Sequence, residues 1–356
     1  MADYTAIDNP SEYFSTTLYT GDGSADQSMT GAGFKPDFLW IKRRNASERH
    51  VLTNVQMGVS SGAYKWLDSA DTHIDFSGGT GVASFDSDGF TIKTSDATWN
   101  TNGSTYVFWS WKANGGTTVS NTTGSITSTV QANTTAGLSI ITWTGTGSAG
   151  TIGHGLGQAP TALIVKNRTT SVDWAVYHQN MTDAGYTLAI NTTDGQLDSG
   201  TNRWNHTAPT SSVIHIGSGQ QTNQNTNNMV CYAFAEKQGY SKFGSYYGNG
   251  ITDGTFVYTG FKPAFVITKP VSAVGSWSLY DHKRKGFNPI DVWLRANGDD
   301  AESTSAISGN DINIFSNGFK LINGDNTINA AGTKYVFLAW AENPFVSSEG
   351  VPTTAR

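Results

Sequence analysis

Tyr19-Thr-Gly-Asp-Gly23, followed by Phe34-Lys-Pro36 and Ile41-Lys42, forms a pattern that occurs three times in this chain. The second copy consists of Trp143-Thr-Gly-Thr-Gly147, Gln158-Ala-Pro160 and Val165-Lys166, and the third of Tyr246-Tyr-Gly-Asn-Gly250, Phe261-Lys-Pro263 and Thr268-Lys269. In each copy the proline follows the first glycine by 15 residues, and the lysine follows the proline by 6. Chance does not keep two spacings through three copies, so the chain is a tandem repeat.

Each copy ends in an apolar stretch with the two-residue alternation of a β-strand. These closing stretches are residues 106–111, 229–234 and 335–340, which begin 70, 69 and 72 residues after the respective proline. Alternation places the following residues on one face and predicts them as core: Val107, Trp109, Trp111; Val230, Tyr232, Phe234; Val336, Leu338, Trp340. We expect Gly21, Gly145 and Gly248 to lie in equivalent turns, and Pro36, Pro160 and Pro263 each to start a strand.

The fold predicted from these patterns is all-β, with three tandem β-sandwich repeats of jelly-roll type. Short strands alternate with Gly, Asn and Ser turns, and no stretch has a sustained helical period. The predicted boundaries are 1–116, 117–238 and 239–346 for the repeats and 347–356 for a polar tail. Residues 113–137 are rich in Thr, Ser, Asn and Gly, so they predict a linker that leaves the first two repeats loosely tethered unless it packs. The short connection 237–245 predicts contact between the second and third repeats.

Composition excludes several classes of protein. Charged residues make up 14% of the 356 residues and aromatic residues 12%, whereas disordered chains are rich in charge and poor in aromatics. The basic clusters Lys42-Arg43-Arg44 and Lys283-Arg284-Lys285 do not extend into a stripe, so nucleic acid is not an expected partner. One cysteine, Cys231, allows neither an intrachain disulfide nor a cysteine-built zinc site, and its place in a closing stretch predicts a buried, inert side chain. The N-terminus lacks a signal peptide and no run is long enough to span a membrane, so synthesis in a cytoplasm is expected.

Two motifs resemble nucleotide or hydrolase sites. Gly145-Thr-Gly-Ser-Ala-Gly150 has the glycine spacing of a dinucleotide fingerprint, but Thr151-Ile-Gly-His-Gly-Leu-Gly157 cannot begin the helix that such a site needs. Gly58-Val-Ser-Ser-Gly62 has the spacing of a nucleophile elbow without the α/β context. Glycine turns are therefore predicted at both places.

Metal and catalytic sites are not predicted either. Asp86-Ser-Asp-Gly89 and Asn297-Gly-Asp-Asp300 have carboxylates but are interpreted as turns. The seven histidines, at positions 50, 73, 154, 178, 206, 215 and 282, lack metal-ligand spacing, and those near Asp173 and Asp281 are assigned structural roles. Paired carboxylates for glycoside cleavage stay open, because the fold and not the sequence creates them. The recurring Trp and Tyr residues are assigned to the core before sugar stacking. No catalytic residue, cofactor or metal is predicted.

Several longer phrases resemble a known family. They are Asn9-Pro-Ser-Glu-Tyr-Phe14, Tyr19-Thr-Gly-Asp-Gly23, Gly33-Phe-Lys-Pro-Asp-Phe-Leu-Trp-Ile-Lys42, Asp173-Trp-Ala-Val-Tyr-His178, Gly239-Tyr-Ser-Lys-Phe-Gly244 and Ala341-Glu-Asn-Pro-Phe345. Across residues 7–345 the chain resembles uncharacterised proteins of marine tailed bacteriophages, a family associated with phage structural genes and described as concanavalin-like or tail-fibre-like. The resemblance implies a virion protein assembled in the bacterial cytoplasm, with no catalytic residues to carry over.

Two functions follow as expectations. The first is a tail fibre or host-adsorption protein that recognises a surface glycan or outer-membrane protein, and the alternative is a head decoration or other architectural virion protein. The expected partners are other virion proteins, and a homo-oligomer is expected, with a trimer favoured, although three repeats in one chain could themselves mimic a trimer. Binding is assigned to the segments that diverge between copies, which are residues 45–71, 198–209, 217–228 and 297–310.

Overall fold

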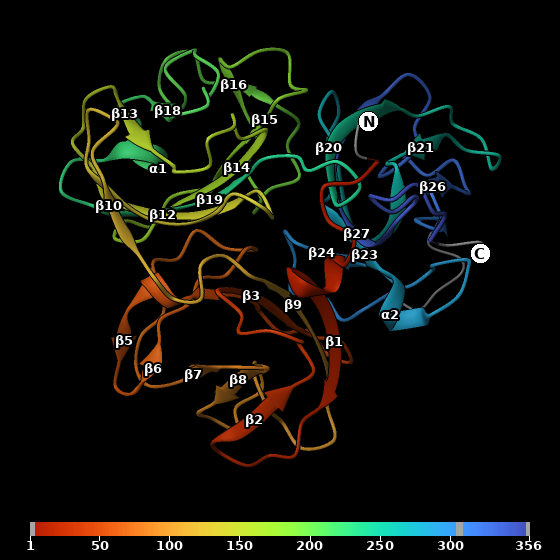
Figure 1. Ribbon diagram of the computed structural model, residues 1–356, viewed down its shortest axis with the longest axis horizontal. Helices are drawn as coiled ribbons and strands as arrows, with labels where there is room; N and C mark the ends of the chain where they lie inside the picture. The colour runs from red at the N-terminus through yellow and green to blue at the C-terminus, as the bar shows by residue number, and fades with distance from the viewer. Residues whose placement is uncertain (1–3, 304–308, 354–356) are drawn as a thin grey trace.

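The computed structural model describes residues 4–303 and 309–353 and is all-β. Three lobes, one for each sequence repeat, surround a common centre (Figure 1). Every pairing between named strands is antiparallel, and the two α-helices of the described chain have four residues each. In the described residues no helix is long and apolar enough to cross a membrane.

The first repeat contains a four-stranded sheet, a three-stranded sheet and a short hairpin. In sheet order, its elements are β1 (Phe14–Thr20), β9 (Thr105–Trp111), β3 (Phe38–Arg43) and β4 (His50–Asn54); β2 (Gln27–Thr30), β8 (Gly89–Ile92) and β7 (Val82–Asp86); and β5 (Val59–Ser60) with β6 (Ala63–Tyr64). Two 3₁₀ turns complete it, η1 (Pro10–Glu12) and η2 (Val55–Met57).

The second repeat contains a six-stranded sheet and two two-stranded ones. In sheet order, its elements are β10 (Val119–Asn121), β11 (Ser128–Asn133), β12 (Leu138–Thr144), β19 (Asn228–Phe234), β14 (Ala162–Asn167) and β15 (Ala175–His178); β13 (Gly150–Gly153) with β18 (Val213–Ile216); β16 (Tyr186–Thr187) with β17 (Leu197–Asp198); and the helix α1 (Gln220–Asn223).

The third repeat contains a five-stranded and a three-stranded sheet. In sheet order, its elements are β20 (Ser241–Tyr247), β27 (Lys334–Pro344), β22 (Phe261–Pro270), β23 (Ser278–Asp281) and β24 (Leu294–Arg295); β21 (Phe256–Tyr258), β26 (Gly318–Leu321) and β25 (Ile312–Phe315); and the helix α2 (His282–Lys285).

The same strand order recurs in all three large sheets. The closing strand β9, β19 or β27 lies between the opening strand β1, β12 or β20 and the strand β3, β14 or β22 that follows the repeated proline. Next comes β4, β15 or β23. Pro36 and Pro160 precede their strands by two residues, as predicted, whereas Pro263 lies inside β22. There the pairing with β27 shifts register, because a proline has no N–H for the ladder.

The repeated first glycine lies in an equivalent turn in each repeat, as predicted. Gly21, Gly145 and Gly248 each donate their N–H to the chain just before the closing strand, at 2.8, 2.8 and 2.9 Å. A Cβ at any of them would lie 2.0–2.3 Å from a carbonyl oxygen, so only glycine fits. The second glycine is required for a different reason, since Gly23, for example, has a φ of 74°.

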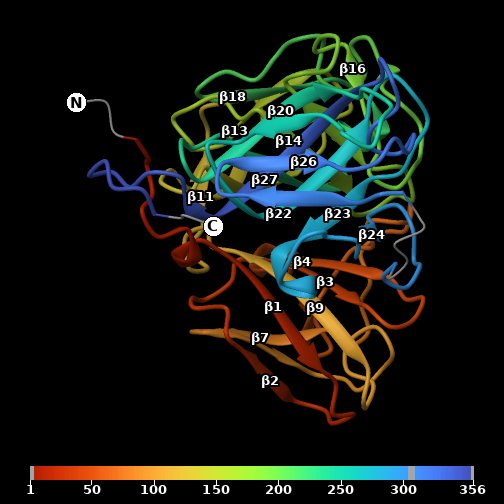
Figure 2. The same cartoon turned by 90° about the vertical axis from the view of Figure 1, so that its right-hand side faces the viewer.

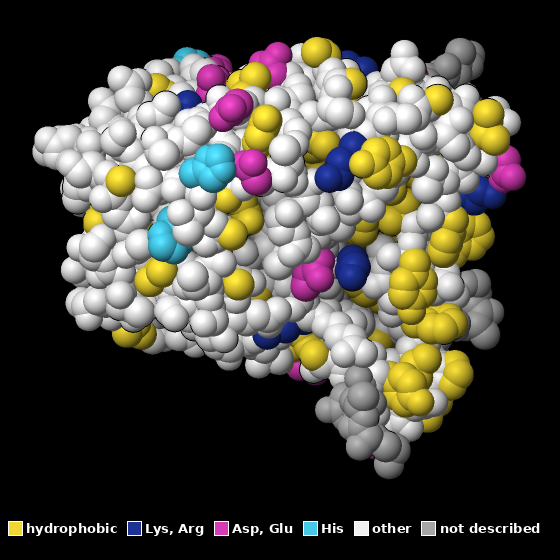
Figure 3. All heavy atoms as spheres, turned by 90° about the horizontal axis from the view of Figure 1, so that it is seen from above, with side chains coloured by type: hydrophobic (Ala, Val, Ile, Leu, Met, Phe, Trp, Pro, Cys, Tyr) yellow, Lys and Arg dark blue, Asp and Glu magenta, His cyan; other side chains and the backbone are white. Residues whose placement is uncertain are grey.

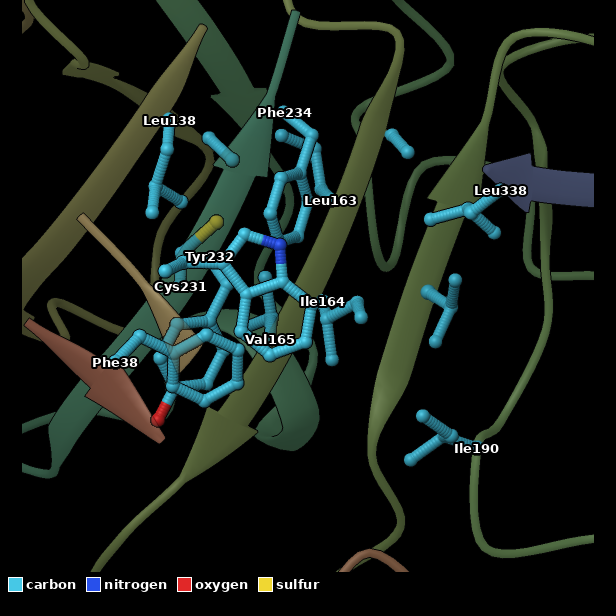
Figure 4. Close-up of a cluster of buried hydrophobic side chains, with 14 of the residues drawn as sticks. Phe38, Leu138, Leu163, Ile164, Val165, Ile190, Cys231, Tyr232, Phe234 and Leu338 are labelled. Carbon is cyan, nitrogen blue, oxygen red and sulfur yellow. The ribbon is translucent and has the colours of Figure 1, made fainter. Parts of the chain in front are cut away.

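Both faces of the closing strands are buried. Val107, Trp109 and Trp111 face the centre of the molecule, where their core also contains residues of the other two repeats. Phe108, on the opposite face, packs between the two sheets of the first repeat. The predicted core faces are confirmed, and they form a shared core. Figure 4 shows one part of it, where Phe38 of the first repeat lies against Tyr232 of the second with ring centroids 4.0 Å apart.

The three repeats contact one another in a closed ring. The repeated lysines Lys42, Lys166 and Lys269 are fully buried, and each donates a hydrogen bond from Nζ to a carbonyl of another repeat. The acceptors are Asp299 O in the third repeat for Lys42 at 3.2 Å, Thr72 O in the first for Lys166 at 2.8 Å, and Thr193 O in the second for Lys269 at 2.9 Å. Each repeat therefore both gives and receives one such contact.

The segment 113–137 is not a loose linker, which corrects that expectation. It forms β10 and β11, and β11 pairs with β12 along six residues. Its start is held by the buried carboxylate of Asp37, which accepts hydrogen bonds from the N–H groups of Ala113, Gly115 and Gly116. Thr, Ser and Asn lower its hydropathy, but main-chain pairing to a sheet edge does not need apolar side chains.

Candidate binding surface

The two glycine motifs are turns, as predicted. Gly145-Thr-Gly-Ser-Ala-Gly150 joins β12 to the strand β13, and no helix begins there. Gly58-Val-Ser-Ser-Gly62 contains β5 and the start of the tight turn to β6, with Ser61 and Gly62 at φ values of 53° and 82°. Neither place has the strand-to-helix geometry that nucleotide or hydrolase chemistry requires.

The acidic motifs are also turns. Asp86-Ser-Asp-Gly89 joins β7 to β8, and the Asp88 carboxylate accepts hydrogen bonds from the N–H groups of Gly31 and Gly33. In the other motif the carbonyl of Asp299 accepts the Lys42 contact. Among the described residues, no group of three or more His, Cys, Asp or Glu side chains is arranged to hold a metal ion.

The buried reactive side chains have structural partners. His178 Nδ1 accepts a hydrogen bond from Asn180 N–H at 3.1 Å, so its other ring nitrogen carries the proton and donates to Phe337 O in the third repeat at 3.3 Å. Burial lowers the pKa of His178 to about 4, which keeps the ring neutral. Cys231 is fully buried, and burial raises the pKa of its thiol. Neither group is placed to react with a ligand.

The two basic clusters are partly used inside the molecule. Lys42 is buried, and Arg44 pairs with Glu302 of the third repeat at 2.9 Å. Arg284 is buried between Asp281 and the same Glu302, at 2.5 and 3.1 Å. The Arg44 ion pair joins the first and third repeats, and the Arg284 guanidinium also lies over the Trp109 ring of the first repeat, so neither is presented to a polyanion.

A cluster of exposed aromatic rings covers the outer side of the third repeat. We call Phe256, Tyr258 and Phe315 the aromatic surface; their exposed fractions are 44%, 60% and 38%. They come from β21 and β25, and the rings of Phe256 and Phe315 meet edge to face with centroids 6.1 Å apart. Figure 3 shows hydrophobic side chains gathered on this side of the molecule.

The fold itself does not require these aromatic side chains. Strand pairing places Ser28 of the first repeat and Thr151 of the second where the third has Phe256. Because the other repeats form the same strands with small polar residues, the exposed rings are an addition specific to the third repeat. Clustered exposed aromatics of this kind mark binding sites.

A hollow of about 560 Å³ lies next to the aromatic surface, where the second and third repeats meet. Tyr258 and Tyr4 contribute exposed rings to it. Polar groups come from Gln158, Glu236, Lys237, Gln238 and Lys242. Aromatic faces with amide, carboxylate and ammonium groups beside them can pack against the C–H groups of a sugar while hydrogen-bonding its hydroxyls.

Comparison with known proteins identifies the family. A family model described as a domain of unknown function, DUF7483, matches residues 9–344. The chain belongs to this family. The DUF7483 match runs through all three repeats and includes the aromatic surface, and the family description names no activity. No curated protein and no solved structure matched the chain.

The divergent segments contain residues that pack inside the molecule or join repeats, and their assignment to binding stays a prediction. Residues 45–71 of the DUF7483 chain contain β4, which is buried throughout, and Ser69, whose hydroxyl donates to Ala296 O of the third repeat at 2.6 Å. Residues 198–209 bury Trp204, and residues 217–228 bury Asn223 in the glycine turn. Of residues 297–310, positions 304–308 lie outside the described residues, and Glu302 joins two repeats.

Sequence reasoning missed the aromatic surface because it assigned recurring aromatics to packing. The residues that would have indicated this surface are aromatic residues that occur in one repeat and not in the other two. Phe256 and Tyr258 alternate with the buried Val257, so both point out of the sheet. An alignment of the three copies in this strand would have found two large rings opposite small polar residues.

Proposed function

We propose that this chain is a virion protein of a tailed bacteriophage that acts in host adsorption, as a tail fibre or a related receptor-binding protein. The resemblance of its repeats to phage structural proteins supports the virion assignment. The observation that carries the binding role is the aromatic surface with its adjoining polar hollow. We propose a cell-surface glycan as the ligand, because this combination of groups suits sugar rings better than a purely apolar partner.

We also propose that the three repeats are β-sandwich units of jelly-roll type. In the first and third repeats a large sheet and a three-stranded sheet enclose a core, which supports this assignment. The role in the particle is binding and not catalysis. A homotrimer, favoured by the symmetry of phage attachment sites, stays a prediction.

The test is a Phe256→Ala, Tyr258→Ala double variant introduced into the phage particle. Both side chains are exposed, so the melting temperature of the purified protein should change little, while particle adsorption should fall by about tenfold or more. Phe287→Ala is the matched control, since Phe287 is 68% exposed but lies outside the aromatic surface.

Adsorption at the wild-type rate by particles that contain the double variant would refute the proposal. A second outcome would refute it in another way. If the double variant folds but is no longer incorporated into particles, the aromatic surface is an assembly contact and the chain is an architectural protein, such as a head decoration.

A further inference from the structure

The opening strand β1 presents one edge without a strand beside it. In an antiparallel ladder the main-chain groups of successive residues point alternately toward the paired strand and away from it. The hydrogen bond from Lys112 N–H to Tyr13 O shows that Tyr13 points toward β9, so Ser15 and Thr17 do as well. The N–H and C=O groups of Phe14, Thr16 and Leu18 therefore point outward. Within the described chain they have no hydrogen-bond partner. Figure 2 shows β1 along the near side of the first repeat.

The second repeat fills the equivalent edge with a strand. Phe14, Thr16 and Leu18 correspond to Leu138, Ile140 and Thr142, because each pairs with the matching residue of its closing strand. In the second repeat these three residues pair with Asn133, Gln131 and Thr129 of β11. The edge that β1 leaves open is thus one that this fold can extend with an antiparallel strand.

The third repeat caps its equivalent edge with side chains. Phe243 of β20 corresponds to Thr16, and its N–H donates to Glu236 Oε1 at 2.6 Å. Its carbonyl accepts a hydrogen bond from Gln179 Nε2 at 2.9 Å. Beside β1, the residues equivalent to Glu236 and Gln179 are Glu342 and His282. These two side chains pair with each other at 3.2 Å and do not cap the edge of β1.

A hollow of about 270 Å³ lies beside the open edge. Phe14, Thr16, Ala264, His282 and Glu342 are among the residues that line it. Thr16 is 6% exposed, and its hydroxyl oxygen is buried without a hydrogen-bond partner among the described residues. A buried hydroxyl with no partner is costly, and a polar group that entered the hollow would satisfy it.

The second repeat shows which side chain fills such a hollow. Gln131 of β11 is fully buried, and its Nε2 donates a hydrogen bond to the carboxylate of Asp37. Asp37 of the first repeat is equivalent in position to Ala264 of the third. The turn η2 follows β4 in the first repeat, just as α2 follows β23 in the third. Because β11 is present in the same structure as η2, a turn at this position leaves room for an added strand. A strand with a long polar residue opposite Thr16 therefore fits beside α2.

We propose that β1 accepts an antiparallel strand from a partner protein, with a Gln-like side chain entering the hollow beside Thr16. Exposed edges are normally protected by charged residues, proline, bulges, or a helix or loop that covers them. β1 has the sequence Phe-Ser-Thr-Thr-Leu-Tyr-Thr, with no charged residue or proline, and it pairs with β9 without a register shift. The helix α2 lies across the hollow from this edge. A second copy of β1 would not complete the site, because it carries no long amide or charged side chain. The proposal is independent of the aromatic surface.

The test uses the peptide of residues 126–134, which contains β11, added to the full chain. Amide hydrogen exchange should slow by about tenfold or more at Thr16 and Leu18 when the peptide is saturating. A peptide with Gln131→Ala should bind more weakly. Leu18→Pro removes an outward N–H without breaking a bond to β9, so it should abolish the protection.

Ser245→Pro is the matched control, because Ser245 is the equivalent position on β20 and should leave peptide binding unchanged. Unchanged exchange at Thr16 and Leu18 with excess peptide would overturn the proposal. Protection that persists in the Leu18→Pro variant would also overturn it. So would dimerisation of the chain alone that Leu18→Pro prevents, since a second copy would then occupy the edge.

Discussion

Three asparagines that the repeat pattern did not identify hold the glycine turns in place. Asn100, Asn223 and Asn329 are fully buried, and each side-chain oxygen accepts the N–H of the residue after the first glycine. Each lies six residues before the first residue of its predicted closing stretch, so the signal was present in the sequence. It was hidden because asparagine is common in this chain and the side-chain contact joins segments about 80 residues apart.

Replacing Asn329 by alanine should destabilise the protein by about 2–4 kcal/mol, because several buried polar groups lose their partner at once. The two N–H groups of the Asn329 side chain are shared among three acceptors, Asn249 Oδ1, Ile251 O and Asn323 O, which lie 2.8–3.0 Å from Nδ2. Urea denaturation measures the loss. Asn225→Ala, at an exposed position, is the control, and equal stability of the two variants would contradict this role.

The buried lysines make stability depend on pH in the alkaline range. Burial lowers the pKa of Lys42 and Lys166 to about 8 and that of Lys269 to about 7, below the ordinary value of 10.5. Between pH 8 and 10 the unfolded chain therefore binds more protons than the folded one, and the free energy of unfolding should rise with pH. Below the folded-state pKa values this contribution is lost.

Urea denaturation between pH 7 and 9.5 should detect that rise, before tyrosine ionisation interferes. Lys269→Met should reduce the slope of the free energy of unfolding against pH, whereas Lys283→Met, at an exposed position, should leave it unchanged. A free energy of unfolding that is flat or falls across this range would show that the lysines are not held in the buried positions described.

At the scale of the element, the sequence predicted the closing strands well and their surroundings poorly. The alternation at Trp109 and Trp111 identified a core face, because burial against any apolar partner gives the same pattern. It could not show that this face meets the other repeats, since periodicity within one strand carries no information about its partner. The strand β11 was missed for a related reason, because its ladder is made by main-chain groups and Thr and Ser are tolerated there.

Truncation of Trp111 or Trp340 to alanine should destabilise the protein by about 3–5 kcal/mol, as for other buried large aromatics. The two indoles pack edge to face in the shared core with ring centroids 5.4 Å apart, and each is 2% exposed. Because they are neighbours from the first and third repeats, the double variant should lose less than the sum of the single losses. Leu197→Ala, on the exposed strand β17, is the control, and additive losses would argue against a shared core.

At the scale of the whole molecule, the three repeats form one closed ring and not three independent domains. The sequence predicted the number of repeats from spacing alone, since spacing is a property of each copy. The ring depends on contacts between copies, such as Asn54 with Tyr232 at 2.9 Å and Trp109 with Asp281 at 3.2 Å, and these residues differ from copy to copy. The repeated lysines do join repeats, but their spacing did not show that their side chains reach across a junction.

Native-state hydrogen exchange in increasing denaturant tests the ring most directly. If the repeats share one core, the amides of β9, β19 and β27 should open together, with free energies within about 1 kcal/mol of one another and of global unfolding. If the repeats were independent domains, one closing strand would open at a free energy several kcal/mol below the others. That result would contradict the account of a single closed ring.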